Sequence, residues 1–282
     1  MAAGCSEQSD ISFLVIVKSS NYAQDAEGNI ELLNYHFFSE IFLQPEGKLT
    51  SATLTRSDAP EEPMGYVSRG DNYYVEGGHF DSQDEVDRAY PNGAYSIAIT
   101  TPTVAVADFT LHLEGPAEAT DIPEAIRVSL WQDAVRVPQS SVDPEKDLVF
   151  RWSAYSNGTK DPRGVVDDMI FLVVADCQGE RIFHTGLPFQ GEYTTFETTE
   201  MLIESGSLRP GQSYSAFVEF PHVVDSRIEK GVPGFASYAT ATYLDLQTTG
   251  VNAGEACPDV SPPMDTGQTD RMESSDSTAQ GR

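Results

Sequence analysis

Residues 207–220 read SLRPGQSYSAFVEF: a proline and a glycine stand just before a run of aromatic and β-branched residues. Proline and glycine are favoured in turns, and aromatic and β-branched residues in strands, so this stretch predicts a turn that leads into a strand. Similar stretches recur at short intervals, among them FLVIVKSSNY, LLNYHFFSEIFLQ, GAYSIAIT, DLVFRWSAY and ASYATATYLDLQTT. This spacing predicts an all-β protein and argues against an α/β nucleotide-binding fold.

Length and composition divide the chain into two domains. At the usual domain size, 282 residues form about two compact domains, and a hydrophobic content of 39% can supply a core for each. We expect a polar tether at 1–10, a β-sandwich at 11–115, a linker at 116–121 and a second β-sandwich at 122–249, in tandem. Residues 250–282 are rich in Ser, Thr, Asp and Pro, and we expect a disordered acidic tail there.

One short helix is expected near residues 82–90. Ser82 and Glu85 have the spacing of a capping box, Val86 and Ala89 supply an apolar face, and a proline at 91 ends the helix. The all-β prediction therefore includes a single helical turn or two in the first domain.

The turn in the opening stretch also resembles a known motif. LRPGQSY, residues 208–214, is similar to the Leu-x-Pro-x-x-x-Tyr corner of fibronectin type III domains. The resemblance implies that Leu208, Pro210 and Tyr214 form this corner, in which the tyrosine hydroxyl reaches back to the backbone and fixes the crossover between the sheets. LVFRWSA likewise resembles strand B of that family, which implies that Trp152 lies in the core. The resemblance covers about residues 122–249 and none of the first half.

The same resemblance implies where two of the three cysteines lie. In a fibronectin type III domain, strands C, F and G are neighbours, and Cys177 ends the expected strand C while Cys257 follows strand G. Both would fall at the same pole, so we expect a Cys177–Cys257 disulfide bond. The alternative is two unrelated thiols.

The first residues, MAAGCSEQSD, resemble a bacterial lipoprotein lipobox, in which the cysteine after small residues is acylated. Two features depart from that pattern: Ala2 stands where leucine is preferred, and a hydrophobic segment does not precede Cys5. The resemblance implies lipidation at Cys5 and a bacterial envelope or secreted protein; a disordered start with a free thiol is the alternative.

Charge restricts the partners. Asp and Glu number 44 against 17 Lys and Arg, a net charge of -27, and this negative field repels phosphate backbones and anionic lipids. No run approaches the roughly 18 apolar residues of a membrane helix. We therefore expect no nucleic-acid partner, and membrane contact only through a lipid at Cys5.

The sequence offers few candidate catalytic or metal-binding residues. The five histidines stand apart without an i, i+4 pair, so a zinc site has little support, and neither a nucleophile elbow nor a phosphate-binding loop is present. Asp167 and Asp168 are adjacent, and neighbouring strand residues point to opposite faces, which argues against a paired-carboxylate site. We expect no catalytic residue, cofactor or metal.

Two functional hypotheses remain. The first is a non-catalytic spacer and interaction module, secreted or anchored to the envelope, that binds an unknown protein or glycan. The second is a carbohydrate-binding or adhesion accessory protein in which exposed aromatic residues such as Tyr73, Tyr74 and Tyr155 stack on sugars. Aromatic side chains exposed in one plane would favour the second hypothesis, and aromatic side chains turned inward would count against it. An enzyme would need a cluster of carboxylates or histidines that the sequence does not reveal.

Overall fold

The computed structural model describes residues 9–70, 72–113 and 122–252. Within these residues the chain forms sixteen strands and one short helix, α1 (Gln83–Ala89). The all-β prediction with one helix near 82–90 is confirmed. Among the same residues, no helix is long and apolar enough to cross a bilayer.

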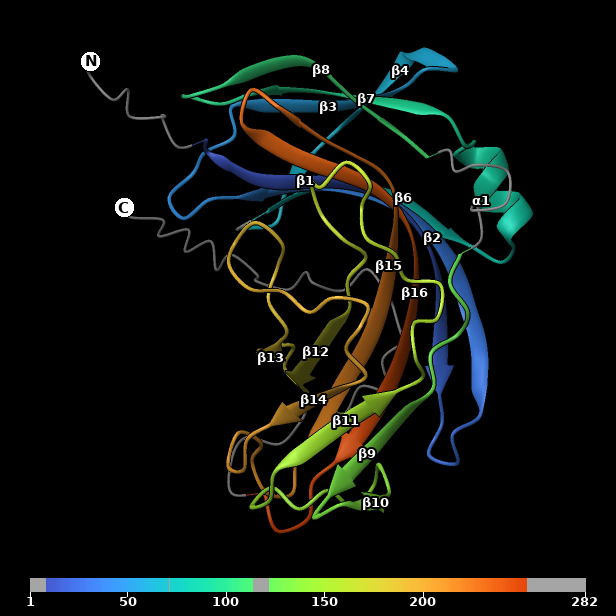
Figure 1. Cartoon of the computed structure of the whole chain (residues 1–282), viewed down its shortest axis with the longest axis vertical. Helices are drawn as coiled ribbons and strands as arrows, with labels where there is room; N and C mark the ends of the chain where they lie inside the picture. Colours follow the sequence, from blue (N-terminus) through green and yellow to red (C-terminus); the bar gives the residue numbers. More distant parts are fainter. Residues whose placement is uncertain (1–8, 71, 114–121, 253–282) are drawn as a thin grey trace, which may run out of the picture.

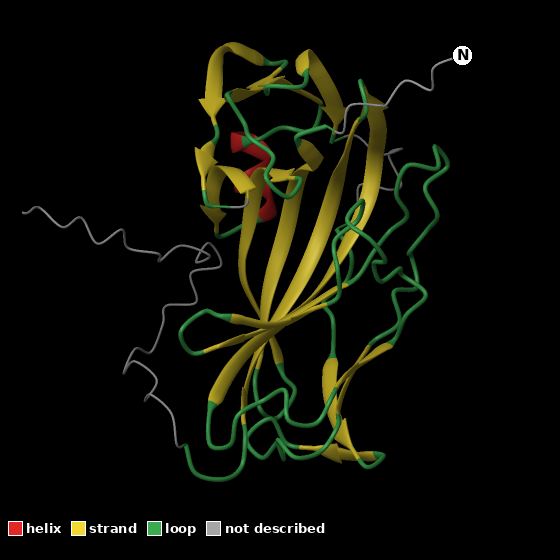
Figure 2. Cartoon of the chain, turned by 90° about the vertical axis from the view of Figure 1, so that its left-hand side faces the viewer, coloured by secondary structure: helices red, strands yellow, loops and turns green. Residues whose placement is uncertain are grey.

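The strands form three sheets (Figures 1 and 2). The large sheet has the order β13 (Arg181–His184), β12 (Phe171–Asp176), β15 (Ser213–Glu229), β16 (Val232–Gln247), β1 (Ile11–Gln24), β2 (Ile30–Leu43), β6 (Asn72–Phe80) and β5 (Val67–Ser68). The upper small sheet has the order β4 (Ala59–Gly65), β3 (Ser51–Arg56), β7 (Ala94–Thr100) and β8 (Ala105–His112). The lower small sheet has the order β10 (Val135–Val137), β9 (Val128–Gln132), β11 (Leu148–Trp152) and β14 (Glu200–Ile203).

The lower sandwich has the strand order of a fibronectin type III domain. Its small sheet packs on the β13-β12-β15-β16 part of the large sheet, and the core between them contains Trp152, Leu208 and Tyr214. The Tyr214 hydroxyl accepts a hydrogen bond from the Arg209 amide at 2.6 Å. The indole Nε1 of Trp152 donates to the Thr198 carbonyl oxygen at 2.9 Å.

The two sandwiches share one continuous sheet. β15 and β16 have 17 and 16 residues, and β16 continues upward to pair in parallel with β1, from Leu14 beside Gly234 to Ala23 beside Tyr243. The tip of this hairpin enters the upper core, where Val232, Ala236 and Tyr238 are buried. The expected first domain, 11–115, therefore does not contain its whole core.

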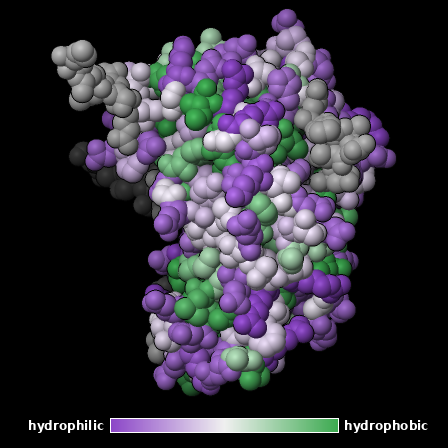
Figure 3. Space-filling view, viewed as in Figure 1, coloured by the Kyte–Doolittle hydropathy of each residue, from purple (hydrophilic) through white to green (hydrophobic). Residues whose placement is uncertain are grey.

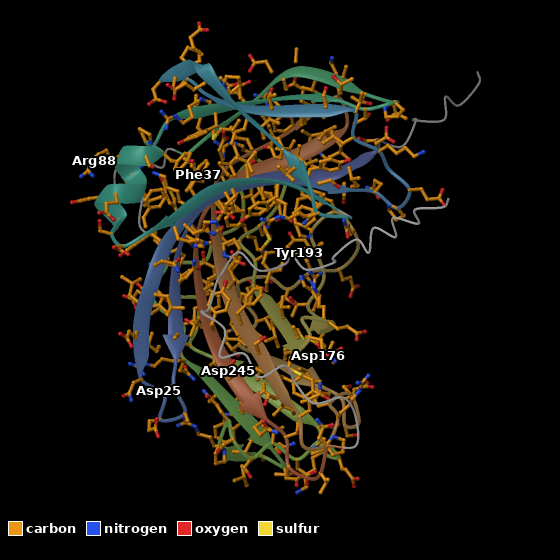
Figure 4. The ribbon with its side chains drawn as sticks, turned by 180° about the vertical axis from the view of Figure 1, so that it is seen from behind. Asp25, Phe37, Arg88, Asp176, Tyr193 and Asp245 are labelled. Carbon is orange, nitrogen blue, oxygen red and sulfur yellow. The ribbon has the colours of Figure 1, made fainter. Side chains whose placement is uncertain are left out.

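The β1–β2 hairpin makes the reverse crossing. Asp25, in its turn, lies at the level of the lower sandwich, whereas Phe37, farther along β2, lies in the upper one (Figure 4). Gln139 Nε2 donates to the Asp25 carbonyl oxygen at 3.2 Å, and Arg127 donates to that of Gly28 at 3.0 Å. Each sandwich therefore sends a hairpin alongside the other.

The chain also crosses between the sandwiches after the expected linker, which lies outside the described residues. The Ile126 amide donates to Thr242 Oγ1 at 3.1 Å, and the Thr240 hydroxyl donates to the Pro123 carbonyl oxygen. Gln24 exchanges two hydrogen bonds with the backbone of Val128, at 2.8 and 2.9 Å. Because alternate residues of a strand share a face, Thr240 and Thr242 lie on the same face of β16 as its core residues, between those of the upper core and those of the lower core. We call this polar section between the two cores the waist.

Helix α1 corrects one local expectation. The Ser82 side chain makes no capping hydrogen bond, and Glu85 instead accepts from the Asp81 amide at 3.1 Å. The capping-box prediction is wrong in this detail because the Glu85 carboxylate reaches one residue beyond Ser82. The helix is fastened to the large sheet by Lys18 of β1, which is 1% exposed and donates to Asp87 at 2.6 Å.

Candidate functional site

The face of the large sheet that points away from the two main cores carries a cluster of ionisable side chains. Glu40 comes from β2, Tyr74 from β6, Glu219 from β15 and Tyr243 from β16. Register places Glu40 beside Tyr74 and Val15, and Glu219 beside Ala241. The sheet thus brings carboxyl groups from both halves of the sequence to one face.

Burial controls the protonation of this cluster. It raises the pKa of Glu40 to about 8, against the opposing effects of the Asn72 hydrogen bond and of Arg69, while the charge of Glu219 raises it further. Burial also raises the pKa of Glu219 to about 7. At neutral pH the Glu40 carboxyl is therefore mostly protonated.

A second cluster lies on the same face of β2 and β6. His36 Nε2 is 2.7 Å from Glu76 Oε1, and the His36 and His79 rings stack with their centroids 4.2 Å apart. Ligand atoms of His36, Glu76 and His79 all lie within 4.8 Å of one another. His36 is buried, whereas Glu76 and His79 are exposed. Two imidazoles and a carboxylate at this spacing can hold a metal ion.

A β-bulge creates this cluster. His36 pairs with His79 and Phe38 with Glu76, so β6 has one residue more than β2 between the two pairs. Three residues apart in a regular strand, Glu76 and His79 would point to opposite faces. The extra residue, with Gly78 at φ +95°, turns both to one face.

Neighbouring groups orient the cluster. His79 Nδ1 lies 3.2 Å from Asn34 Oδ1, and the Asn21 amide donates to the same oxygen at 2.8 Å. Burial tends to raise the pKa of Glu76, but the hydrogen bond from His36, with the Gly78 amide and His79, lowers it to about 2. The Glu76 carboxylate is therefore ionised across the physiological range.

Sequence reasoning missed this cluster because it looked for histidines at helical spacing. His36 and His79 are 43 residues apart, and only strand pairing brings them together. One signal was available: EGGH, residues 76–79, has two glycines inside a strand, which marks a bulge.

The other predicted site residues lie apart from both clusters. Trp152, Leu208 and Tyr214 are in the lower core, and Pro210 lies in the turn before β15. Cys177 is disulfide-bonded. Cys5 and Cys257 lie outside the described residues, so lipidation at Cys5 and the pairing of Cys177 with Cys257 stay predictions.

The adjacent aspartates are used to hold a loop. Asp168, 1% exposed, accepts hydrogen bonds from the amides of Thr159 and Val223 at 2.8 and 2.7 Å, and lies 2.8 Å from His222 Nδ1. Asp167 accepts from the Asp161 amide at 2.9 Å. These bonds fasten the segment before β12 to β15.

The aromatic residues considered for sugar stacking are turned inward. Tyr74 and Tyr155 are 7% and 6% exposed, and Tyr73 packs against the upper core. Among the described residues, none of the large exposed hydrophobic side chains is aromatic. This arrangement counts against the carbohydrate-stacking hypothesis.

No known protein family matches the sequence, and no curated protein matches it. Similar solved structures include the BSP domain of a biofilm-associated protein, at 11% identity over 83% of this chain and 30% of that chain, with a TM-score of 0.21. A central fibronectin-III array of RIM-binding protein has 13% identity over 85% of this chain and 71% of that one, with a TM-score of 0.22. The FN1–FN3 domains of chicken CNTN1 have 11% identity over 77% and 64%, with a TM-score of 0.17. Similarity at this level supports no statement about function.

Proposed function

We propose that this protein is a non-catalytic spacer and interaction module that works outside the cytosol, anchored to a bacterial envelope through Cys5 or secreted. The observation that carries the proposal is the continuous large sheet, in which the β15–β16 and β1–β2 hairpins cross between the sandwiches in opposite directions. A spacer must hold its ends at a fixed separation. A shared sheet does this better than a flexible linker, because bending it breaks several backbone hydrogen bonds at once.

The waist strengthens this argument. The bonds of Thr240, Thr242 and Gln24 to the segment 123–128 tie the crossing chain to the shared sheet. Buried hydrogen bonds of this kind cost free energy when one partner is left unpaired. We therefore expect the two sandwiches to move as one body.

The surface also disfavours self-association. Edge strand β4 has the sequence APEEPMG, with two prolines and two exposed glutamates. Prolines and charges on an edge strand block its pairing with another chain. On the face seen in Figure 3, hydrophobic residues are spread in small groups among hydrophilic ones.

The extracellular part of the proposal rests on chemistry. Disulfide bonds such as the one at Cys177 persist in oxidising compartments. A net charge of -27 keeps such a protein soluble and disfavours nucleic acids. The partner is a protein or glycan that tolerates a strongly acidic surface.

Intact mass spectrometry of the protein from its native cells tests the anchoring. An N-terminus at an acylated Cys5, and a gain of two hydrogens on reduction, would support an envelope protein with a disulfide bond. An unmodified chain that starts at Met1 and does not gain mass on reduction would refute this part of the proposal.

Hydrogen exchange tests the rigid-spacer part. We expect the amides of β16 near Thr240 and Thr242 to exchange as slowly as those beside Leu244 in the lower core. Fast exchange at the waist, with slow exchange in both cores, would mean that the sandwiches move independently, and the spacer proposal would fail.

A further inference from the structure

We propose that His36, Glu76 and His79 form a binding site for a divalent transition metal, with Zn²⁺ as the best-fitting ion. The proposal is independent of the spacer function. It rests on the position of three ligand groups on one face of paired strands, with ligand atoms within 4.8 Å of one another.

The backbone builds this arrangement. A regular β2–β6 ladder would turn Glu76 and His79 to opposite faces, and the bulge at Gly77–Gly78 prevents this. A side chain at Gly77 would meet the Phe37 ring and carbonyl oxygen at 2.5 and 2.6 Å. Glycine is therefore required at Gly77 by space and favoured at Gly78 by its positive φ.

The donor set selects the class of metal. Imidazole nitrogens suit Zn²⁺, Cu²⁺ and Ni²⁺, whereas Ca²⁺ and Mg²⁺ prefer oxygen ligands. Two histidines and one glutamate give three protein ligands, which leaves a further position for water or for a group from a partner. Because Glu76 and His79 are exposed, that position is accessible from solvent.

The surroundings resemble the supporting shell of a metal site. Asn34 Oδ1 can accept the Nδ1–H of His79, an outer hydrogen bond of the kind that orients a metal-binding imidazole. Asn21, which is 2% exposed, donates to that Asn34 oxygen and so fixes its direction. Both oxygens of the Glu76 carboxylate have neighbours that hold them in place: Oε1 accepts from the Gly78 amide at 2.9 Å, and Oε2 lies 3.8 Å from Arg69.

Other histidine–carboxylate pairs make the contrast clear. His112 lies 3.1 Å from Asp225, and His222 lies 2.8 Å from Asp168, each with one imidazole. In the described part of the chain, only the His36 cluster brings three potential ligands of this kind within reach of one ion. An ordinary ion pair between His36 and Glu76 would not require the second imidazole.

Calorimetric titration of the full-length protein with Zn²⁺ tests the proposal, under non-reducing conditions and in a Cys5→Ser background that removes a competing thiol. We expect one Zn²⁺ per chain and a rise in the melting temperature at saturation. His79→Gln and Glu76→Gln should each abolish this binding step. Both positions are exposed, so the variants should keep the wild-type circular dichroism spectrum.

His112→Gln is the matched control, because it removes an exposed histidine from a pair with one carboxylate. It should bind Zn²⁺ as the wild type does. Asn34→Ala should weaken binding by about tenfold, the usual cost of losing an outer hydrogen bond to a ligand. Absence of binding to the wild type, or equal binding by the wild type, His79→Gln and Glu76→Gln, would overturn the proposal.

Discussion

The two sandwiches differ in where their cores come from. The lower core is built from residues between Ile126 and Leu246, a single continuous part of the chain. The upper core is built from residues between Ile11 and Leu113, and also from Val232, Ala236 and Tyr238 at the tip of the β15–β16 hairpin. The lower sandwich can therefore support the upper one, but the upper sandwich is incomplete without the lower sequence.

The largest effect should appear when the chain is divided. We expect a fragment of residues 9–113 to show no cooperative unfolding transition, because it lacks the hairpin tip and the β16 partner of β1. A fragment of residues 122–252 should keep a transition in urea, followed by tryptophan fluorescence. A folded 9–113 fragment would contradict the claim that the upper sandwich depends on the hairpin.

Matched Phe→Ala substitutions in the two cores should distinguish the unfolding of the two sandwiches within the intact chain. Phe109 in the upper core and Phe150 in the lower core are both 0% exposed, and Phe→Ala at such sites costs about 3–5 kcal/mol. Both tryptophans, Trp131 and Trp152, lie on strands of the lower small sheet, so their fluorescence reports on that sandwich.

Phe150→Ala should move the fluorescence and circular dichroism transitions together, because loss of the lower sandwich removes the hairpin from the upper one. Phe109→Ala should shift the circular dichroism transition while the fluorescence transition stays later. Coincident curves for Phe109→Ala would show that the two sandwiches unfold as one unit.

Two buried tyrosines give a smaller contrast. Tyr214→Phe leaves the Arg209 amide without its acceptor, and we expect a loss of about 1–3 kcal/mol of unfolding free energy. Tyr95 in the upper core donates to the Pro91 carbonyl oxygen at 2.7 Å. A carbonyl tolerates a lost partner better than an amide does, so Tyr95→Phe should cost less. Equal losses of unfolding free energy in the two variants, measured in urea, would contradict this difference between the amide and the carbonyl.

The sequence predicted local features well and long-range ones poorly. The tyrosine stretch LRPGQSY depends on residues close in the chain, and its Tyr214–Arg209 hydrogen bond spans five positions. The parallel pairing of β1 with β16 joins residues more than 200 positions apart, and strand patterns do not specify a partner. The same limit concealed the His36–His79 pair, although the glycines at 77 and 78 marked the bulge.

The smallest effect should come from the half-buried carboxyl groups of Glu40 and Glu219, which come from the two halves of the sequence. Glu40 has a pKa of about 8 in the folded protein against the ordinary value of 4.5, raised by burial and by Glu219. Between these values the unfolded state binds fewer protons than the folded state, so stability falls as pH rises through this window. Glu40→Gln cannot ionise and should escape this loss.

The variant should unfold in urea like the wild type near pH 4. At pH 9 it should be more stable than the wild type by about 1 kcal/mol. This gain is smaller than the full pKa shift would give, because solvent screens the charge of the half-buried Glu40 carboxylate. Glu219→Gln provides the test of contact between the halves. Since the charge of Glu219 helps to raise the pKa of Glu40, its removal should lower that pKa and end the Glu40-dependent loss of stability at a lower pH. The decisive comparison is the upper pH limit of the stability difference between the protein with Glu40 and its Glu40→Gln variant, measured by urea unfolding. This limit should fall toward neutral pH in the Glu219→Gln background. An unchanged limit would mean that Glu40 on β2 and Glu219 on β15 do not sense each other's charge.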